Sequence, residues 1–353
     1  MGSTDDSLQS ILDYILSEYT RGGKEFGDSV INEDEEIREI TSKSAIILLE
    51  KLKSGVPAKL EASKGVEKEF EHAVLETWKK PFGLLDLLLY VSLEIASEFN
   101  STFESKPSSK HSYVREALVK EQANACLVFN EIVHLLKSGF PSGALSHWKT
   151  LHEMACISYF ISKNGEDVAK RFLDYSVVES YFQSEAIYEH QQEMDCDSLA
   201  EREFKAVKRK FNRVKKSRGA EFVKKANYPY GWVPRDVLKQ RSLRQIEKSV
   251  KLDILRPYYD LAGYNLYGGP EGVMFKPRIA KKTNKNLGLP VGPSNYGLAD
   301  PGKIAAISLG QVTACLLLHE STVKRLIVVE ALRNLVDEIC DAFCEIQAEF
   351  SRE

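Results

Sequence analysis

Cysteine is scarce in this sequence, and its spacing excludes the usual cysteine motifs. The 353 residues contain six cysteines, of which only Cys340 and Cys344 lie close together along the chain. Neither a CxxC pair nor a zinc-knuckle spacing is present. We therefore expect reduced thiols in a cytoplasmic protein.

Long apolar runs are also missing. The most apolar stretch, FGLLDLLLYVSLEIA, is interrupted by Asp86 and Glu94 and is too short to cross a bilayer. The first residues lack the basic segment and the following apolar run of a secretion signal. These features predict a cytoplasmic protein that does not associate with membranes.

Motifs of the common nucleotide-binding and hydrolytic folds are absent. The chain has no GxxxxGK(S/T), no GxGxxG between a strand and a helix, no GxSxG and no HExxH. The stretch HEMAC begins like the last of these, but Cys156 replaces the second histidine. Because His152 and Cys156 alone would leave a zinc ion short of ligands, we expect neither a metal nor another cofactor.

Helical periodicity is what the sequence has in abundance. Leu8, Ile11, Leu12, Ile15 and Leu16 follow the spacing of an amphipathic helix, and similar patterns recur along the chain, whereas strand patterns are nearly absent. Each apolar helix face needs another helix to cover it. The pattern therefore predicts an all-α protein, a multi-helix bundle.

Glycine and proline punctuate this helical pattern. Gly55 is expected to end a helix, Pro81 to stop or kink one, and NYPYGWVPRD to interrupt one. Residues 256–302 contain glycine or proline every few positions, which predicts a loop insertion before the last two helices.

The best candidate for a domain boundary is the Ser-, Lys- and Pro-rich stretch 101–112. It predicts an acidic helical region, residues 1–105, followed by a second helical domain, residues 106–353. The first region carries 21 acidic and 11 basic residues, so the second is basic although the whole chain has a net charge of −3.

The basic excess gathers in residues 202–225, expected to form one helix, and again in residues 276–285. A basic helix face can bind phosphates or RNA, and the alternative is a solvated helix face and a loop. The candidate nucleic-acid-binding residues are Lys208, Arg209, Lys215 and Lys216.

Three polar residues open an otherwise apolar helix in ALSHWKTLHEMACISYFI. Lys149, His152 and Glu153 precede a run that is apolar on nearly all sides, so the helix should be central and its polar stripe partly buried. A buried carboxylate needs a cation, and Arg171 on the next helix can offer two parallel donors. We predict that Arg171 pairs with Glu153 and that His152 faces the segment 264–269. The residues predicted to be buried in this helix are Leu145, Trp148, Leu151, Ala155 and Tyr159.

The candidate catalytic residues, His152, Glu153, Lys149 and Arg171, have two interpretations. One is a network of charges that fixes helix register. The other is a site in which His152, beside a carboxylate, acts as a general acid or base.

Tyrosines near the glycine-rich segments are candidates for stacking on a nucleobase, although helical cores use tyrosine too. The candidate ligand-binding residues are Tyr258, Tyr264, Tyr267, Asn295 and Tyr296.

The stretches GFPSGALSHWKTLHEMACISYFI, EDVAKRFLDYSVVESY and VGPSNYGLADPGKIAAISLGQVT resemble the family of unknown function DUF5677. The resemblance spans about residues 113–343. It implies a helical bacterial protein without an assigned reaction, and a distant kinship to the HEPN-like fold of prokaryotic toxins. Lys149 stands where the family usually has arginine, and Tyr267 stands at the place of a family histidine.

Taken with the resemblance, these features predict a homodimeric protein of bacterial stress response or defence, such as phage defence. It would bind a partner, a nucleotide or a nucleic acid at the polar site around His152. The first alternative is a metal-independent ribonuclease or nucleotide-acting hydrolase with His152 as general acid/base. None of the seven histidines has an arginine four to six residues before it, the spacing that HEPN-like ribonucleases use. The second alternative is a non-catalytic dimerising scaffold.

Overall fold

The computed structural model describes residues 8–20, 35–104, 112–190, 201–272 and 292–350. Helices account for most of these residues, and no strand occurs among them. The predicted all-α fold is therefore confirmed. The chain divides into two compact units, residues 1–73 and residues 74–353.

The smaller unit holds α1, Leu8–Thr20, and most of α2, Glu35–Thr77. The predicted helix end at Gly55 is wrong, because α2 continues through Gly55 and Pro57 as one helix. A proline inside a helix removes one backbone hydrogen bond, which a helix of this length can lose without ending. Lys51 places its Nζ 3.5 Å from the centroid of the Tyr14 ring and so joins the two helices.

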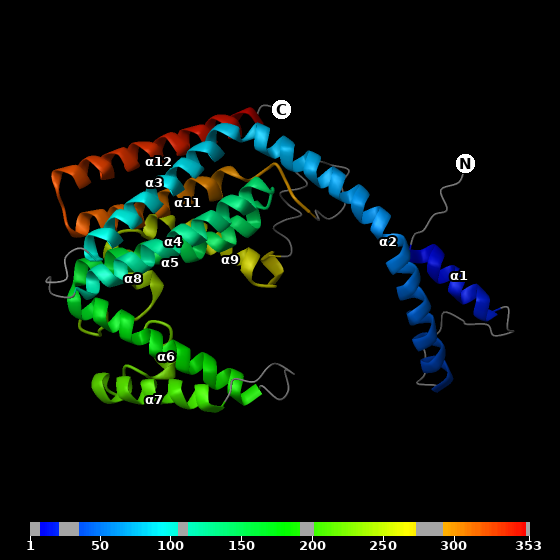
Figure 1. The fold of residues 1–353 in the computed structure, drawn as a ribbon, viewed down its shortest axis with the longest axis horizontal. Helices are drawn as coiled ribbons and strands as arrows, with labels where there is room; N and C mark the ends of the chain where they lie inside the picture. Colours follow the sequence, from blue (N-terminus) through cyan, green and yellow to red (C-terminus); the bar gives the residue numbers. More distant parts are fainter. Residues whose placement is uncertain (1–7, 21–34, 105–111, 191–200, 273–291, 351–353) are drawn as a thin grey trace. The chain divides into compact units, whose positions relative to one another are not determined.

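The larger unit contains the remaining helices (Figure 1). Its long helices are α3 Lys79–Glu104, α4 Tyr113–Lys137, α5 Pro141–Asn164, α6 Glu166–His190, α7 Glu201–Arg218, α11 Ala299–His319 and α12 Val323–Phe350. Its short elements are α8 Leu243–Val250, α9 Arg256–Leu266 and the 3-10 turns Lys225–Asn227 and Asp253–Leu255.

The division between the units falls within α2, not in the stretch 101–112 that the composition suggested. Helix α3, which the sequence-based division grouped with the acidic region, packs on α4, α11 and α12. It does so because Leu85, Leu88 and Phe99 form a buried face. Residues 105–111 lie outside the described residues.

Helix α5 lies at the centre of the larger unit and packs on α4, α6, α8, α9 and α11. Leu145, Trp148, Leu151 and Ala155 are buried as predicted, whereas Tyr159 is only partly buried. The Trp148 indole Nε1 donates hydrogen bonds of 3.0 Å to the carbonyl of Ile304 and to Ser308 Oγ, which joins α5 to α11.

The predicted stop or kink at Pro81 falls close to an observed boundary, because α2 ends at Thr77 and α3 begins at Lys79, with Pro81 in its first turn. Two other sequence-based boundaries need correction. The basic helix α7 ends at Arg218 and does not reach Lys225, because Gly219 adopts a φ of 87°. Helix α9 occupies part of the expected loop insertion, and residues 273–291 of that insertion lie outside the described residues.

Helix α11 is long and apolar enough, by composition alone, to cross a membrane. Within the larger unit, however, 67% of its most apolar stretch is buried against other helices. A core helix of a bundle has the same composition, because it is covered on most sides.

Gly302 in α11 provides a test of this packing. A Cβ added there would lie 2.3 Å from the ring of Phe343, which is fully buried in α12. We expect Gly302→Ala to lower the free energy of unfolding by about 1–3 kcal/mol, because the ring has no room to move. Chemical denaturation followed by circular dichroism measures it.

The matched control is Gly83→Ala in α3, where an added Cβ meets nothing within 4 Å. This substitution should stabilise the protein by up to about 1 kcal/mol through helix propensity. Equal stability of the two variants would contradict the observed contact between α11 and α12.

Candidate functional site

The polar residues of α5 face three different surroundings. His152 is fully buried, while Lys149 and Glu153 are partly buried. Because α5 is covered by other helices on most sides, each of these side chains must find a partner or reach a groove.

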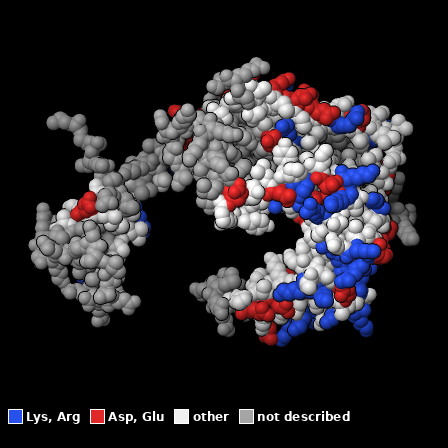
Figure 2. Space-filling view, turned by 180° about the vertical axis from the view of Figure 1, so that it is seen from behind, with Lys and Arg blue, Asp and Glu red and all other residues white. Residues whose placement is uncertain are grey.

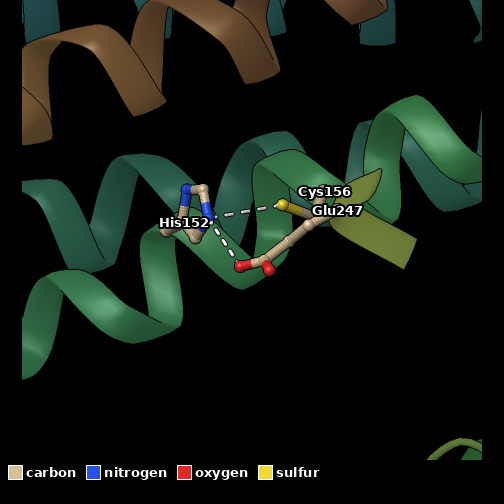
Figure 3. A group of neighbouring side chains, drawn as sticks. All are labelled: His152, Cys156 and Glu247. Atoms are coloured by element: carbon tan, nitrogen blue, oxygen red, sulfur yellow. Dashed lines mark hydrogen bonds and ion pairs between the residues drawn. The ribbon is translucent and has the colours of Figure 1, made fainter. Parts of the chain in front are cut away.

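His152 belongs to a buried network with α8 and α9 (Figure 3). Its Nε2 lies 3.0 Å from Oε1 of Glu247, which is also fully buried. The second oxygen of Glu247, Oε2, accepts a hydrogen bond from the guanidinium of Arg256 at the start of α9. Arg256 therefore supplies the positive charge that a buried carboxylate requires.

Aromatic rings and a thiol complete the surroundings of His152. Its ring stacks on Trp148 at 5.1 Å between centroids and lies 6.0 Å from the ring of Tyr259. Cys156, one helical turn further along α5, has its Sγ 3.6 Å from His152 Nε2. The other ring nitrogen, Nδ1, has no hydrogen-bond partner among the described residues. The predicted orientation of His152 towards residues 264–269 is wrong, because the ring points to α8.

Glu153 pairs with a tyrosine and not with arginine. The hydroxyl of Tyr230 donates a 2.5 Å hydrogen bond to Glu153 Oε1. Burial and the charge of Glu153 raise the pKa of Tyr230 above its ordinary value, which keeps the hydroxyl protonated and able to donate. Burial, together with the charge of Glu153, also raises the pKa of Glu121 on α4 to about 8. Glu121 is therefore mainly protonated at neutral pH.

The predicted ion pair between Glu153 and Arg171 is wrong. Both side chains are described, and the Arg171 Nε instead donates to the carbonyl of Trp232 at 2.7 Å, while its guanidinium lies 5.0 Å from the Phe222 ring. The reason is that the segment 219–242 supplies a partner to each residue, the Tyr230 hydroxyl to Glu153 and the Trp232 carbonyl to Arg171. Arg171 thus holds this segment on α6.

Of the three polar residues Lys149, His152 and Glu153, Lys149 is the one that lines a groove. Its Nζ lies 4.1 Å from the centroid of the Tyr259 ring and 5.8 Å from that of Tyr267. No carboxylate among the described residues lies within ion-pair distance of this Nζ. Burial is the largest influence on Lys149 and lowers its pKa.

The groove beside Lys149 has a volume of about 800 Å³ and lies between α4, α5 and the end of α9. Its wall combines exposed apolar surface with polar groups, among them a 2.5 Å contact between His147 Nε2 and Glu131 Oε2. The side chains that line it include Glu131, His134, Phe140, His147, Lys149 and Leu266.

The five candidate ligand-binding residues do not form one site. Tyr258, Tyr264 and Tyr267 belong to α9 or its end, and Tyr267 approaches Lys149 with 71% of its surface exposed. Asn295 and Tyr296 lie elsewhere: the Trp78 indole donates to Asn295 Oδ1 at 2.7 Å, and Tyr296 packs on Phe350 at 5.1 Å.

The four candidate nucleic-acid-binding residues are all exposed on α7. Figure 2 shows Lys and Arg side chains gathered over the part of the surface formed by α6 and α7. A shallow depression on α7 is lined by Arg202, Lys205, Lys208 and Arg209. The second basic run, residues 276–285, lies outside the described residues.

Sequence patterns did not reveal the partners of the α5 residues. Glu247 lies 95 positions away from His152, and Tyr230 lies 77 positions away from Glu153. One local feature of the sequence could have indicated the partner of His152. Glu247 is an acidic residue on the same buried side of the short amphipathic helix α8 as Leu243 and Ile246.

The fold and the site together define a class of protein: a helical bundle with a buried charge network at its central helix. Residues 121–266 match the DUF5677 model, described as a family of unknown function, and this part of the chain is similar to that family. The match covers α4 to α9, the helices that carry the network and the groove. No curated protein and no solved structure gives a significant match.

Arg256 should be essential to stability, because it compensates a fully buried carboxylate. We expect Arg256→Met to lower the free energy of unfolding by about 3–5 kcal/mol. The control is Arg333→Met, which removes an exposed pair with Glu330 and should cost about 0–1 kcal/mol.

Urea denaturation of both variants measures the difference. Adding Glu247→Gln to Arg256→Met should recover part of the loss, because no charge is then left alone in the core. Equal, small effects of the two arginine substitutions would show that the buried charge is not stabilised by Arg256.

Proposed function

We propose that the larger unit binds a small phosphorylated ligand of the nucleotide class in the groove beside Lys149. The observation that carries this proposal is a lysine without an ionic partner among the described residues, positioned between two tyrosine rings at the edge of a groove. A partly buried ammonium group gains from an anion at this place, because burial disfavours an uncompensated charge.

The lining of the groove suits such a ligand. Lys149 would pair with a phosphate, which has the negative charge that the groove lacks at this edge. Phe140, exposed by 42%, offers an aromatic face within the groove on which a base can stack. Tyr267 is not part of the lining but lies beside Lys149 and is 71% exposed. Thr150 adds a hydroxyl group able to donate or accept hydrogen bonds, and Ser146, whose hydroxyl donates to the carbonyl of Ser142, adds an acceptor.

Hydrolysis with His152 as general acid/base is less well supported by the geometry. The His152 ring has no exposed surface, and its Nε2 is occupied by Glu247. A general acid or base must reach the proton that it transfers. The groove is therefore proposed as a binding site, and a role in bacterial defence or stress response rests on the family resemblance alone.

Lys149→Met should weaken nucleotide binding at least about tenfold, since a hydrogen bond to a charged group contributes about 1.5–3 kcal/mol. Isothermal titration calorimetry with nucleoside mono-, di- and triphosphates measures the affinities. The matched control is Lys170→Met, which removes another lysine that lies over a tyrosine ring, at 4.7 Å from Tyr113, outside the groove.

Failure of every nucleotide to bind, or equal binding by both variants, would contradict the proposal. Chromatography of the same mixtures distinguishes binding from hydrolysis. Product formation that depends on His152 would favour the hydrolytic alternative over a binding protein. Light scattering of the same samples tests the predicted dimer and the scaffold alternative.

A nucleic acid is the second candidate ligand, favoured by α7. Lys208, Arg209, Lys215 and Lys216 are exposed and form no ion pair with another described residue. By contrast, Arg218 at the end of α7 is engaged by Asp167 and Asp174 of α6. The exposed residues provide positive charge without a shaped pocket, which suits contacts to a phosphate backbone but not the recognition of bases.

Replacing these four α7 residues with glutamate should abolish binding to RNA and DNA. Binding by the natural sequence should be weak, independent of base sequence and steeply dependent on salt, because counterions are released from the phosphates. Fluorescence anisotropy at several salt concentrations measures both effects.

The control replaces four exposed lysines elsewhere with glutamate: Lys53, Lys68, Lys239 and Lys248. This variant has the same change in net charge and should keep most of its affinity. Binding that is equally strong at low and high salt, or equally lost in both variants, would rule out α7 as the contact surface.

A further inference from the structure

We propose that His152, Cys156 and Glu247 bind a transition-metal ion of the Zn²⁺ class in the core of the larger unit. The three residues offer an imidazole nitrogen, a thiol sulfur and a carboxylate oxygen, and these atoms all lie within 4.8 Å of one another. All three side chains are buried. They point towards one another from α5 and α8 (Figure 3).

The distances between the ligand atoms are close to those of a zinc site. With bonds of about 2.05 Å to nitrogen, 2.3 Å to sulfur and 2.1 Å to oxygen, tetrahedral zinc separates nitrogen from sulfur by about 3.6 Å and nitrogen from oxygen by about 3.4 Å. His152 Nε2 lies 3.6 Å from Cys156 Sγ and 3.0 Å from Glu247 Oε1. These two separations therefore lie within a few tenths of an ångström of the zinc values, and the third, between sulfur and oxygen, is at most 4.8 Å.

The fold positions two of the ligands on one helix. His152 and Cys156 are four residues apart on α5, so their side chains lie on the same face one turn apart. This spacing requires no backbone adjustment, and the third ligand comes from α8, which packs on α5. A site shared by two helices would also fix their relative position.

Glu247 is oriented as a metal ligand with an outer partner. Arg256 binds its Oε2, which leaves Oε1 in contact with His152. Metal-bound carboxylates are commonly held by a hydrogen bond of this kind on the outer side. Arg256 therefore does not block the site, because it binds the oxygen that does not contact His152.

The proton balance of binding is simple. His152 Nε2 must present its lone pair, so its proton moves to Nδ1, which has no partner among the described residues. Cys156 binds as thiolate and releases one proton to solvent. The thiolate of Cys156 and the carboxylate of Glu247 then offset the two charges of the ion, and Arg256, still bound to Glu247, leaves the loaded site with one net positive charge.

The donor set selects the class of metal. Thiolate and imidazole ligands favour Zn²⁺ or Co²⁺, whereas Ca²⁺ and Mg²⁺ require oxygen ligands. Three protein ligands leave a fourth position for water, as in zinc sites that are not purely structural. This inference does not depend on the proposed nucleotide groove, because Lys149 is not a ligand.

The experiment is metal analysis of the full chain. After chelator treatment and dialysis, the protein is incubated with Zn²⁺ or with Co²⁺, and bound metal is measured by mass spectrometry. We expect one ion per chain, and with Co²⁺ a near-ultraviolet absorption band from the bond to thiolate. Cys156→Ser should lose the band and most of the metal, with its fold checked by circular dichroism.

The controls are Cys315→Ser, a buried thiol outside the cluster, and Cys344→Ser, an exposed one. Both should keep the ion and the band. A natural-sequence protein that takes up neither metal would overturn the proposal, whether or not Cys156→Ser folds. Metal binding unchanged by Cys156→Ser would overturn it as well and would leave a hydrogen-bonded network only.

Discussion

The buried carboxylate of Glu247 is the constraint on which the central part of the larger unit depends. A charge without exposed surface costs several kcal/mol unless cations and hydrogen-bond donors surround it. His152 provides the donor from α5 and Arg256 provides the cation from α9. Two short helices, which propensity alone would hardly stabilise, are thereby fixed on the central helix.

This constraint separates the two sides of α5. On the side of α8, His152 and Cys156 are enclosed. On the side of α4 and the end of α9, Lys149 reaches a groove. Glu153 lies between them and is held by Tyr230 from the segment 219–242. One helix thus presents an enclosed polar cluster on one side and lines an open groove on another, since neighbouring positions on a helix point in different directions.

The sequence predicted the elements that depend on local pattern. Helical periodicity identified the bundle, and the apolar run after Glu153 identified α5 as its central helix. The requirement that a buried carboxylate be paired was correct, but it was applied to Glu153 and Arg171. The carboxylate that is fully buried is Glu247, and its cation lies nine residues further along the chain. Choosing between several acids and several arginines requires the helix arrangement, which long-range packing determines. Glycine was also misleading in α2, because the helix continues through Gly55, and a single residue of low helix propensity does not end a helix of this length.

Tyr259 connects the enclosed cluster to the groove. Its ring centroid lies 6.0 Å from the His152 ring, 4.6 Å from the Arg256 guanidinium and 4.1 Å from Lys149 Nζ. Arg256 and Tyr259 are on the same short helix, so a change in how Glu247 holds Arg256 also moves the ring that supports Lys149. A ligand on Lys149 and an ion on Glu247 would therefore act on one helix, and thermodynamic linkage requires each to affect the binding of the other by the same factor. The physical basis of such coupling is the position of α9. Among the described residues, the ion pair between Arg256 and Glu247 is the only one that connects α9 to a buried residue.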